Sequence, residues 1–230
     1  MPCGVPSLLC GPIAGSTVVS QANELRMNEV PPLNTELTSG RLRLRVCRNE
    51  DADAVFDAEA ESYDRLCPWF WWCHPRHSRE QCRSWARGRA DAWRADEEYS
   101  FLILDSETGR VFGCAWLNAI DRTAMRASLG YWVRSSSTGK GIATEAARLV
   151  ARWGFDALKL QRIELVLAVG NKESERVAHK LGAIREGVAR RRLRVNDKNQ
   201  DAFVYSILPG EVTANGLPKR GSQKSSPVQS

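Results

Sequence analysis

The stretch RSSSTGKGIATEAARLVARWGF, residues 134–155, places a Gly-Lys-Gly turn immediately before a long amphipathic segment. Apolar residues recur every three or four positions from Ile142 to Trp153, which predicts a helix of about four turns with one buried face. Gly139 and Gly141 allow the backbone to turn sharply ahead of this helix and to approach a ligand closely. The first amides of a helix have no internal acceptors, and the helix dipole favours negative charge there. The sequence therefore predicts an anion site, suited to phosphate, at the start of the helix.

The usual nucleotide-binding motifs do not match this turn. A P-loop needs glycine where Arg134 stands, and Ser or Thr where Gly141 stands. A dinucleotide fingerprint needs a third glycine at the position of Thr144. An ordinary ATPase and a Rossmann enzyme are therefore not favoured, and a helix-entry turn that binds nothing is the alternative.

The composition bounds the domain organisation. The 230 residues suit one globular domain with tails, and the net charge of +6 suits polyanionic ligands of several kinds. Residues 1–40 are rich in Pro, Gly, Ser, Thr and Asn, which predicts a disordered extension, and Met27 is a candidate true start. We expect the folded domain at residues 41–210 and a flexible basic tail at 211–230. No apolar run reaches the roughly 18 residues that span a bilayer, so no membrane partner is expected.

Hydrophobic periodicity predicts alternating strands and helices in the domain. The fold class is therefore α/β (α+β), a mixed sheet with helices packed against it. Ser78 is predicted to cap the second helix, and Gly182 to end the last one. The expected strands are 42–46, 99–105, 110–121, 126–133, 162–169 and 202–208, and the expected helices are about 51–62, 79–95, 142–155 and 171–181.

Several motifs in this order resemble those of one enzyme family. The strand motif LGYWV is followed by TGKGI and ATEAA, then by an apolar strand and an Asn-x-x-Ser…Lys-x-Gly element from Asn171 to Gly182. An Asp-x-x-x-Tyr-Ser element closes the domain at residues 201–206. Together they resemble the GNAT superfamily of acetyl-CoA-dependent N-acetyltransferases, and within it the ribosomal-protein N-terminal acetyltransferases of RimJ/RimL type. The resemblance covers about residues 41–210 and implies a GNAT-like, mostly antiparallel sheet flanked by helices.

The resemblance also implies a cofactor site for acetyl-CoA as co-substrate. In the family, backbone amides of the glycine turn bind the coenzyme A pyrophosphate, and the sheet strands splay so that pantetheine pairs with backbone. Asn171 would hold the pantetheine arm. The residues assigned to cofactor binding are Trp132, Val133, Thr138, Gly139, Lys140, Gly141, Ile142, Ala143 and Asn171.

The sequence departs from the family pattern at three points, one in the cofactor turn and two in the catalytic residues. Thr138 replaces a long side-chain donor, and Ala178 stands where many members have a catalytic tyrosine. Ser174 is then the candidate acid, as in the RimJ/RimL subgroup, although an N-cap at Asn171 with a first-turn serine explains the same residues structurally. The family often has an acidic residue, a candidate base, after the LGYW strand, where this chain has Arg134-Ser135-Ser136. The general base is therefore unassigned, with Glu98, Asp121 or a water chain as candidates.

The segment LCPWFWWCHPRH, residues 66–77, is rich in aromatic residues and cysteine. Trp69, Trp71 and Trp72 are candidates to line the acceptor pocket, and the alternative is that they cover the sheet as core. The Cys and His spacing here matches no usual zinc ligand pair, so no metal is expected. Seven cysteines without a compact framework predict reduced thiols in a cytoplasmic protein.

The predicted function is acetyl transfer from acetyl-CoA to a primary amine, either a protein N-terminus or a small molecule. The alternative is a non-catalytic acyl-CoA sensor, and a zinc-stabilised RNA-associated protein is a third reading. The five arginines of residues 185–195 are interpreted as a solvated strand face, so nucleic acid is not an expected partner. A homodimer is one oligomeric state that the sequence allows.

Overall fold

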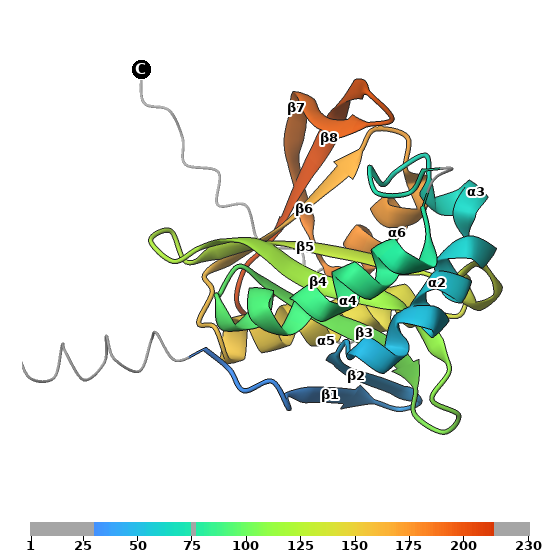
Figure 1. Ribbon diagram of the computed structural model, residues 1–230. Coiled ribbons are helices and arrows are strands. Elements are labelled where there is room, and N and C mark those ends of the chain that lie inside the picture. Colours follow the sequence, from blue (N-terminus) through green and yellow to red (C-terminus); the bar gives the residue numbers. More distant parts are fainter. Residues whose placement is uncertain (1–29, 75–76, 214–230) are drawn as a thin grey trace, which may run out of the picture. The chain divides into compact units, whose positions relative to one another are not determined.

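The computed structural model describes residues 30–74 and 77–213, and its strands form one eight-stranded sheet (Figure 1). No helix in these described ranges has both the length and the apolar character needed to cross a membrane. The strands are β1 (Glu36–Ser39), β2 (Leu42–Val46), β3 (Glu98–Asp105), β4 (Val111–Asp121), β5 (Arg126–Val133), β6 (Arg162–Ala168), β7 (Ile184–Val195) and β8 (Lys198–Ile207). The helices are α2 (Ala52–Glu61), α3 (Tyr63–Leu66), α4 (Arg79–Arg94), α5 (Ile142–Asp156) and α6 (Lys172–Leu181), with short 3₁₀ turns η1 (Asn49–Asp51) and η2 (Ser135–Ser137).

The sheet is mixed and mostly antiparallel, as expected. Its strand order is β1-β2-β3-β4-β5-β6-β8-β7, and only the β5–β6 pair is parallel. Antiparallel neighbours can be joined by short turns, whereas a parallel pair needs a crossover, which α5 supplies here. The helix that follows the glycine turn therefore connects the two strands that run in the same direction.

The two faces of the sheet carry separate cores because side chains alternate along each strand. In β3, Tyr99, Phe101 and Ile103 belong to the core on the α5 and α6 side. Their neighbours Leu102 and Leu104 belong to a second core that includes residues of α2 and of the middle of α4, whereas Trp93 near the end of α4 belongs to the first core. Figure 1 shows α2 and α4 on one side of the strands and α5 on the other.

The ordered domain begins before residue 41, which corrects the expected boundary of the disordered extension. Strand β1 (Glu36–Ser39) pairs with β2, although the sequence analysis assigned residues 1–40 to the disordered extension. Upstream, the indole Nε1 of Trp93 donates to the Pro31 carbonyl over 2.6 Å, and Trp93 packs edge-on against Tyr99. A strand as short as β1 is stabilised by its pairing with β2, so the composition of its own four residues did not reveal it. Residues 1–29 lie outside the described residues.

The C-terminal part of the domain also differs from the expectation. The arginine run forms β7, whose mostly exposed side chains confirm the solvated strand face, and β7 pairs along its length with β8. Residues 211–213, assigned to the tail, lie against the domain. The Thr213 amide donates to the Leu181 carbonyl over 3.2 Å, and its own carbonyl accepts from Arg148 over 2.7 Å. The rest of the predicted tail lies outside the described residues.

The cysteines are not all reduced, which corrects the expectation of free thiols. Cys67 and Cys73 form a disulfide whose Cα atoms are 4.7 Å apart. The chain turns back between them, which a spacing of six residues does not reveal by itself. Among the described cysteines, Cys47, Cys82 and Cys114 are free and buried.

Truncation of a core side chain in β6 should be strongly destabilising. Leu165 is fully buried in the core on the α5 side, so Leu165→Ala should lower the free energy of unfolding by about 2–5 kcal/mol through lost burial and a residual cavity. Urea denaturation measures the change. The control is Ile184→Ala, because Ile184 is 58% exposed and should change stability by about 0.5 kcal/mol at most. Equal effects of the two variants would contradict this account of the core.

Candidate active site

The glycine turn precedes α5 as the sequence predicts. Gly139 and Gly141 have φ angles of 75° and 79°, the left-handed region that favours glycine. A Cβ atom built at either position would meet nothing within 4 Å, so the space beside the turn is open. The first amide to donate into the helix is that of Glu145, which reaches the Gly141 carbonyl over 3.0 Å. The amides before it in the first turn are therefore available to an anion.

The end of α2 holds the start of this turn. The Glu61 carboxylate accepts from the Ser136 amide over 2.8 Å and from Arg134 Nε over 2.9 Å. The Ser135 amide donates to the hydroxyl of buried Ser62 over 2.9 Å. The bond from Arg134, assisted by the Ser136 hydroxyl and amide, lowers the pKa of Glu61 to about 2, from an ordinary value of 4.5. The turn is thus fixed by contacts from a helix about 70 residues earlier in the chain.

Beside the turn, the sheet opens between β5 and β6. The two strands pair only from Arg126 to Ser128, after which β5 continues alone on that side to Val133. Backbone groups point alternately to the two sides of a strand. Because the Arg134 amide donates to β4 at the Phe112 carbonyl, the backbone groups of Tyr131 and Val133 point toward the open side. The strand separation implied by the resemblance is therefore present, with free backbone facing it.

A cleft of about 350 Å³ lies at this opening. The end of β5, the glycine turn, one face of α6 and the region around α3 all line it. The predicted site residues that line it are Trp69, Trp132, Val133, Thr138, Gly139, Gly141, Ile142, Ala143, Asn171 and Ser174. Residues distant in sequence are thus brought to one cleft, and their individual roles remain predictions.

Three predicted site residues are not among those that line the cleft. The Lys140 ammonium instead donates to the Ser136 carbonyl over 2.9 Å. Trp71 is 74% exposed. Trp72 packs behind the cleft wall, with its ring centroid 6.3 Å from that of Trp132, as the alternative of a core role anticipated. Geometry supports Trp69 alone of the three tryptophans at the acceptor side, together with Phe70, which was not singled out.

Two residues that carry hydroxyl groups line the cleft where β5 meets the first turn of α6, namely Tyr131 of β5 and Ser174 of α6. The Asn171 side chain caps this helix by accepting from the Ser174 amide over 3.1 Å, as the capping interpretation predicts. The Tyr131 hydroxyl lies 3.4 Å from the Ser174 carbonyl, to which it donates. Burial raises the pKa of Tyr131, which keeps this hydroxyl protonated. Tyr131 lies in the LGYW strand motif, but a sequence pattern does not reveal which strand residues reach α6.

The candidate bases do not line the cleft. Asp121 lies opposite Arg126 at the far end of β5, and seven residues of strand, roughly 23 Å, separate that end from Val133. This distance excludes Asp121 as a base acting at the cleft. Glu98 forms an ion pair with Arg89 of α4. Among the described residues, Glu173 is the carboxylate that lines the cleft, and sequence analysis missed it.

Basic side chains that the sequence analysis did not assign to the site also line the cleft, although Lys180 belongs to the Asn-x-x-Ser…Lys-x-Gly element. Arg65 of α3 forms an ion pair with Glu173 of α6, so a contact bridges the two helices beside the cleft. Arg176 and Lys180, one helical turn apart on α6, supply further positive charge. Their spacing on one face of the helix was the available signal, because residues four apart lie on the same side.

Comparison with known proteins places this geometry in a family. A model described as an acetyltransferase (GNAT) domain matches residues 41–184. The chain belongs to the GNAT acetyltransferase family. The chain is also 30% identical over 175 residues to YdaF of Bacillus subtilis (strain 168), provisionally named a ribosomal N-acetyltransferase, which covers 74% of this chain and 92% of the relative. These matches confirm the family that the motifs predict.

Solved GNAT structures share the fold. A Mycobacterium smegmatis RimJ, in complex with CoA-disulfide, matches with a TM-score of 0.71 and 28% identity, over 79% of this chain and 90% of the other. The ribosomal-protein-serine acetyltransferase of Escherichia coli (strain K12) is 26% identical over 110 residues, which covers 48% of this chain and 62% of the relative. This GNAT acetyltransferase is thus similar in sequence and fold to proteins named for acetylation of ribosomal proteins.

The contact between Glu61 and the turn should make stability depend on pH in acid. Because the folded-state pKa of Glu61 is lowered to about 2, its contribution is complete above about pH 5 and is lost as pH falls toward 2. Glu61→Gln should therefore lower the free energy of unfolding at neutral pH, and the difference from the parent protein should shrink between pH 5 and 2. Denaturation at several pH values measures this. Glu107→Gln, in the exposed turn after β3, is the control and should show no such trend. A constant difference across the range would contradict the assignment.

Proposed function

We propose that this protein transfers the acetyl group of acetyl-CoA to a primary amine, and that a protein N-terminus is the preferred acceptor class. The observation that carries the proposal is the meeting of the open glycine turn with the separated strands β5 and β6 in one cleft. The similarity to proteins named as ribosomal-protein acetyltransferases supports the choice of acceptor.

The cleft offers a place for each part of acetyl-CoA. The free amides at the start of α5 suit the pyrophosphate, and Arg176 and Lys180 suit further phosphate. The exposed backbone of Tyr131 and Val133 suits the amide groups of pantetheine, which would add to the sheet as a strand does. The RimJ structure that holds a CoA-disulfide supports this assignment.

Acetyl transfer needs an amine without its extra proton, a polarised thioester and a protonated leaving group. The attacking nitrogen forms a bond to the carbonyl carbon, its proton passes to a base or to water, and the carbon–sulfur bond breaks. The Val133 amide faces the opening and suits the oxyanion that forms on the carbonyl. The leaving thiolate then takes a proton from a hydroxyl at the first turn of α6, where Ser174 lies.

The acceptor would approach from the side of α3 and the aromatic segment. Leu66, Trp69 and Phe70 line the cleft there and exclude water from the reacting atoms. Glu173 adds a carboxylate that suits a cationic amine, although its ion pair with Arg65 must then rearrange.

Calorimetric titration of the purified protein with acetyl-CoA, beside ATP and NAD, tests the co-substrate. We expect micromolar binding of acetyl-CoA and little binding of the others. Gly141→Asp should weaken acetyl-CoA binding by about tenfold or more, because it strains a left-handed position and sets a carboxylate at the anion site. Gly109→Asp is the matched control, because Gly109 has a φ of 70° and equally open space but lies in the turn between β3 and β4.

Acetylation of peptides with free N-termini, followed by mass spectrometry, distinguishes an acetyltransferase from a protein that only binds acetyl-CoA. Acetyl-CoA binding without acetylation of any amine would favour a non-catalytic acyl-CoA sensor. Equal losses in the Gly141 and Gly109 variants would show a general effect of strain and remove the anion site from the proposal.

Replacement of Ser174 should affect turnover rather than binding. Ser174→Ala should lower kcat by roughly 10- to 100-fold and leave acetyl-CoA affinity within twofold, because the helix cap uses the Ser174 amide and not its hydroxyl. Steady-state kinetics with a peptide acceptor measure this, and Ser84→Ala, at an exposed serine of α4 away from the cleft, is the control. Unchanged activity would leave Ser174 a structural residue and make Tyr131 the donor to examine by Tyr131→Phe.

A further inference from the structure

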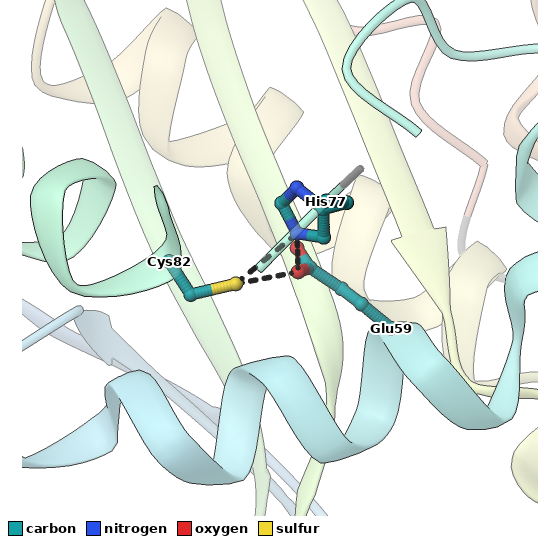
Figure 2. A group of neighbouring side chains, drawn as sticks. All are labelled: Glu59, His77 and Cys82. Atoms are coloured by element: carbon teal, nitrogen blue, oxygen red, sulfur yellow. Dashed lines mark hydrogen bonds and ion pairs between the residues drawn. The ribbon is translucent and has the colours of Figure 1, made fainter. Parts of the chain in front are cut away.

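Three side chains with different donor atoms converge outside the cleft (Figure 2). Glu59 comes from α2, His77 precedes α4, and Cys82 lies in the first turns of α4. His77 Nε2 lies 2.7 Å from Glu59 Oε2 and 3.2 Å from Cys82 Sγ, and that sulfur is 2.9 Å from the same carboxylate oxygen. An oxygen, a nitrogen and a sulfur thus face one point from three places in the chain, and none of the three residues lines the cleft.

The surroundings of this cluster favour a bound cation. Glu59 is 9% exposed and Cys82 is 2% exposed, so the carboxylate is largely removed from water. No arginine or lysine of the described residues forms an ion pair with Glu59, whose recorded partners are the other two members. Burial of a carboxylate is costly unless a positive charge offsets it, and a metal ion bound here would supply that charge.

The donor set indicates which metal. Carboxylate, imidazole and thiolate are the ligands of tetrahedral Zn²⁺ sites, and magnesium and calcium take oxygen ligands almost alone. Zinc–ligand bonds of about 2.0–2.3 Å set donor atoms roughly 3.3–3.6 Å apart in a tetrahedron. The cluster therefore needs to widen by about half an ångström, which small side-chain rotations provide.

We propose that Glu59, His77 and Cys82 form a Zn²⁺ site that fixes the aromatic segment to α2 and α4. On binding, the Cys82 thiol loses its proton to solvent, His77 coordinates through Nε2 and keeps hydrogen on Nδ1, and the carboxylate binds as it is. The two anionic ligands balance the charge of the ion. Water completes the tetrahedron in the fourth position.

The consequence of the site lies in the packing between it and the cleft. The His77 ring packs on Trp72 at 5.8 Å, and Trp72 packs on both Phe70 and Trp132, which line the cleft. An ion bound to His77 therefore restricts the movement of Trp72, and through it that of Phe70 and Trp132 in the wall of the cleft. This role is independent of acetyl transfer and requires no activity for its test.

The test measures zinc directly on the full-length protein. The protein is stripped with a chelator, without thiol reductant so that the Cys67–Cys73 disulfide stays closed, and is titrated with ZnCl₂ by calorimetry. We expect one Zn²⁺ per chain, proton release on binding, and a rise of about 5 °C in the thermal unfolding midpoint. His77→Gln and Cys82→Ala should each lower the affinity at least tenfold.

Matched variants identify the ligands. His179→Gln and Cys114→Ala change residues of the same types outside the cluster, and Cys3→Ser with Cys10→Ser changes the cysteines near the N-terminus. All of these should keep the zinc. Loss of zinc with the N-terminal pair, or unchanged binding in His77→Gln, would overturn the proposal. If a variant fails to fold, the test is made on the unsubstituted protein with Co²⁺ in place of Zn²⁺. A thiolate-to-cobalt absorption band is expected, and its absence would overturn the proposal.

Discussion

The separation of β5 from β6 is the constraint on which the rest of the site depends. The strands pair over three residue pairs and then part, yet β6 stays in the sheet because it pairs with β8 on its other side from Ile163 to Ala168. The sheet can therefore open in its middle without losing its hydrogen bonds elsewhere. The groups that face this opening are backbone amides and carbonyls of β5, so the cleft has hydrogen-bond donors and acceptors that do not come from side chains.

At the glycine turn itself, the positive character of the proposed phosphate site comes from the backbone. Lys140, the charged residue of the turn, directs its ammonium to the Ser136 carbonyl instead of the cleft. The amides at the start of α5 keep their orientation because Glu61 and Ser62 hold the preceding turn. This explains how Thr138 can replace the long side chain of the family pattern: the site depends on the position of the chain more than on that side chain.

Sequence reasoning succeeded where the determinant is local. The helix after the glycine turn, the Asn171 cap and the left-handed Gly182 at the end of α6 each follow from a few adjacent residues. It failed where the partner lies far along the chain. Strand β1 depends on β2, and Glu59 joins His77 and Cys82 from a separate helix. The aromatic segment shows a success and a failure together. Its composition identified the tryptophans as candidates, but it did not reveal which of them would line the cleft.

The two walls of the cleft are held by different kinds of interaction, and this difference bears on specificity. The wall at the glycine turn is fixed by charged hydrogen bonds from α2 and by backbone geometry, which tolerate little displacement. The wall at Phe70 rests on ring contacts through Trp72, which bend more readily than hydrogen bonds do. Acceptor preference can therefore change through substitutions in the aromatic segment while the proposed cofactor side stays intact. A metal ion behind that segment would make the softer wall as firm as the other.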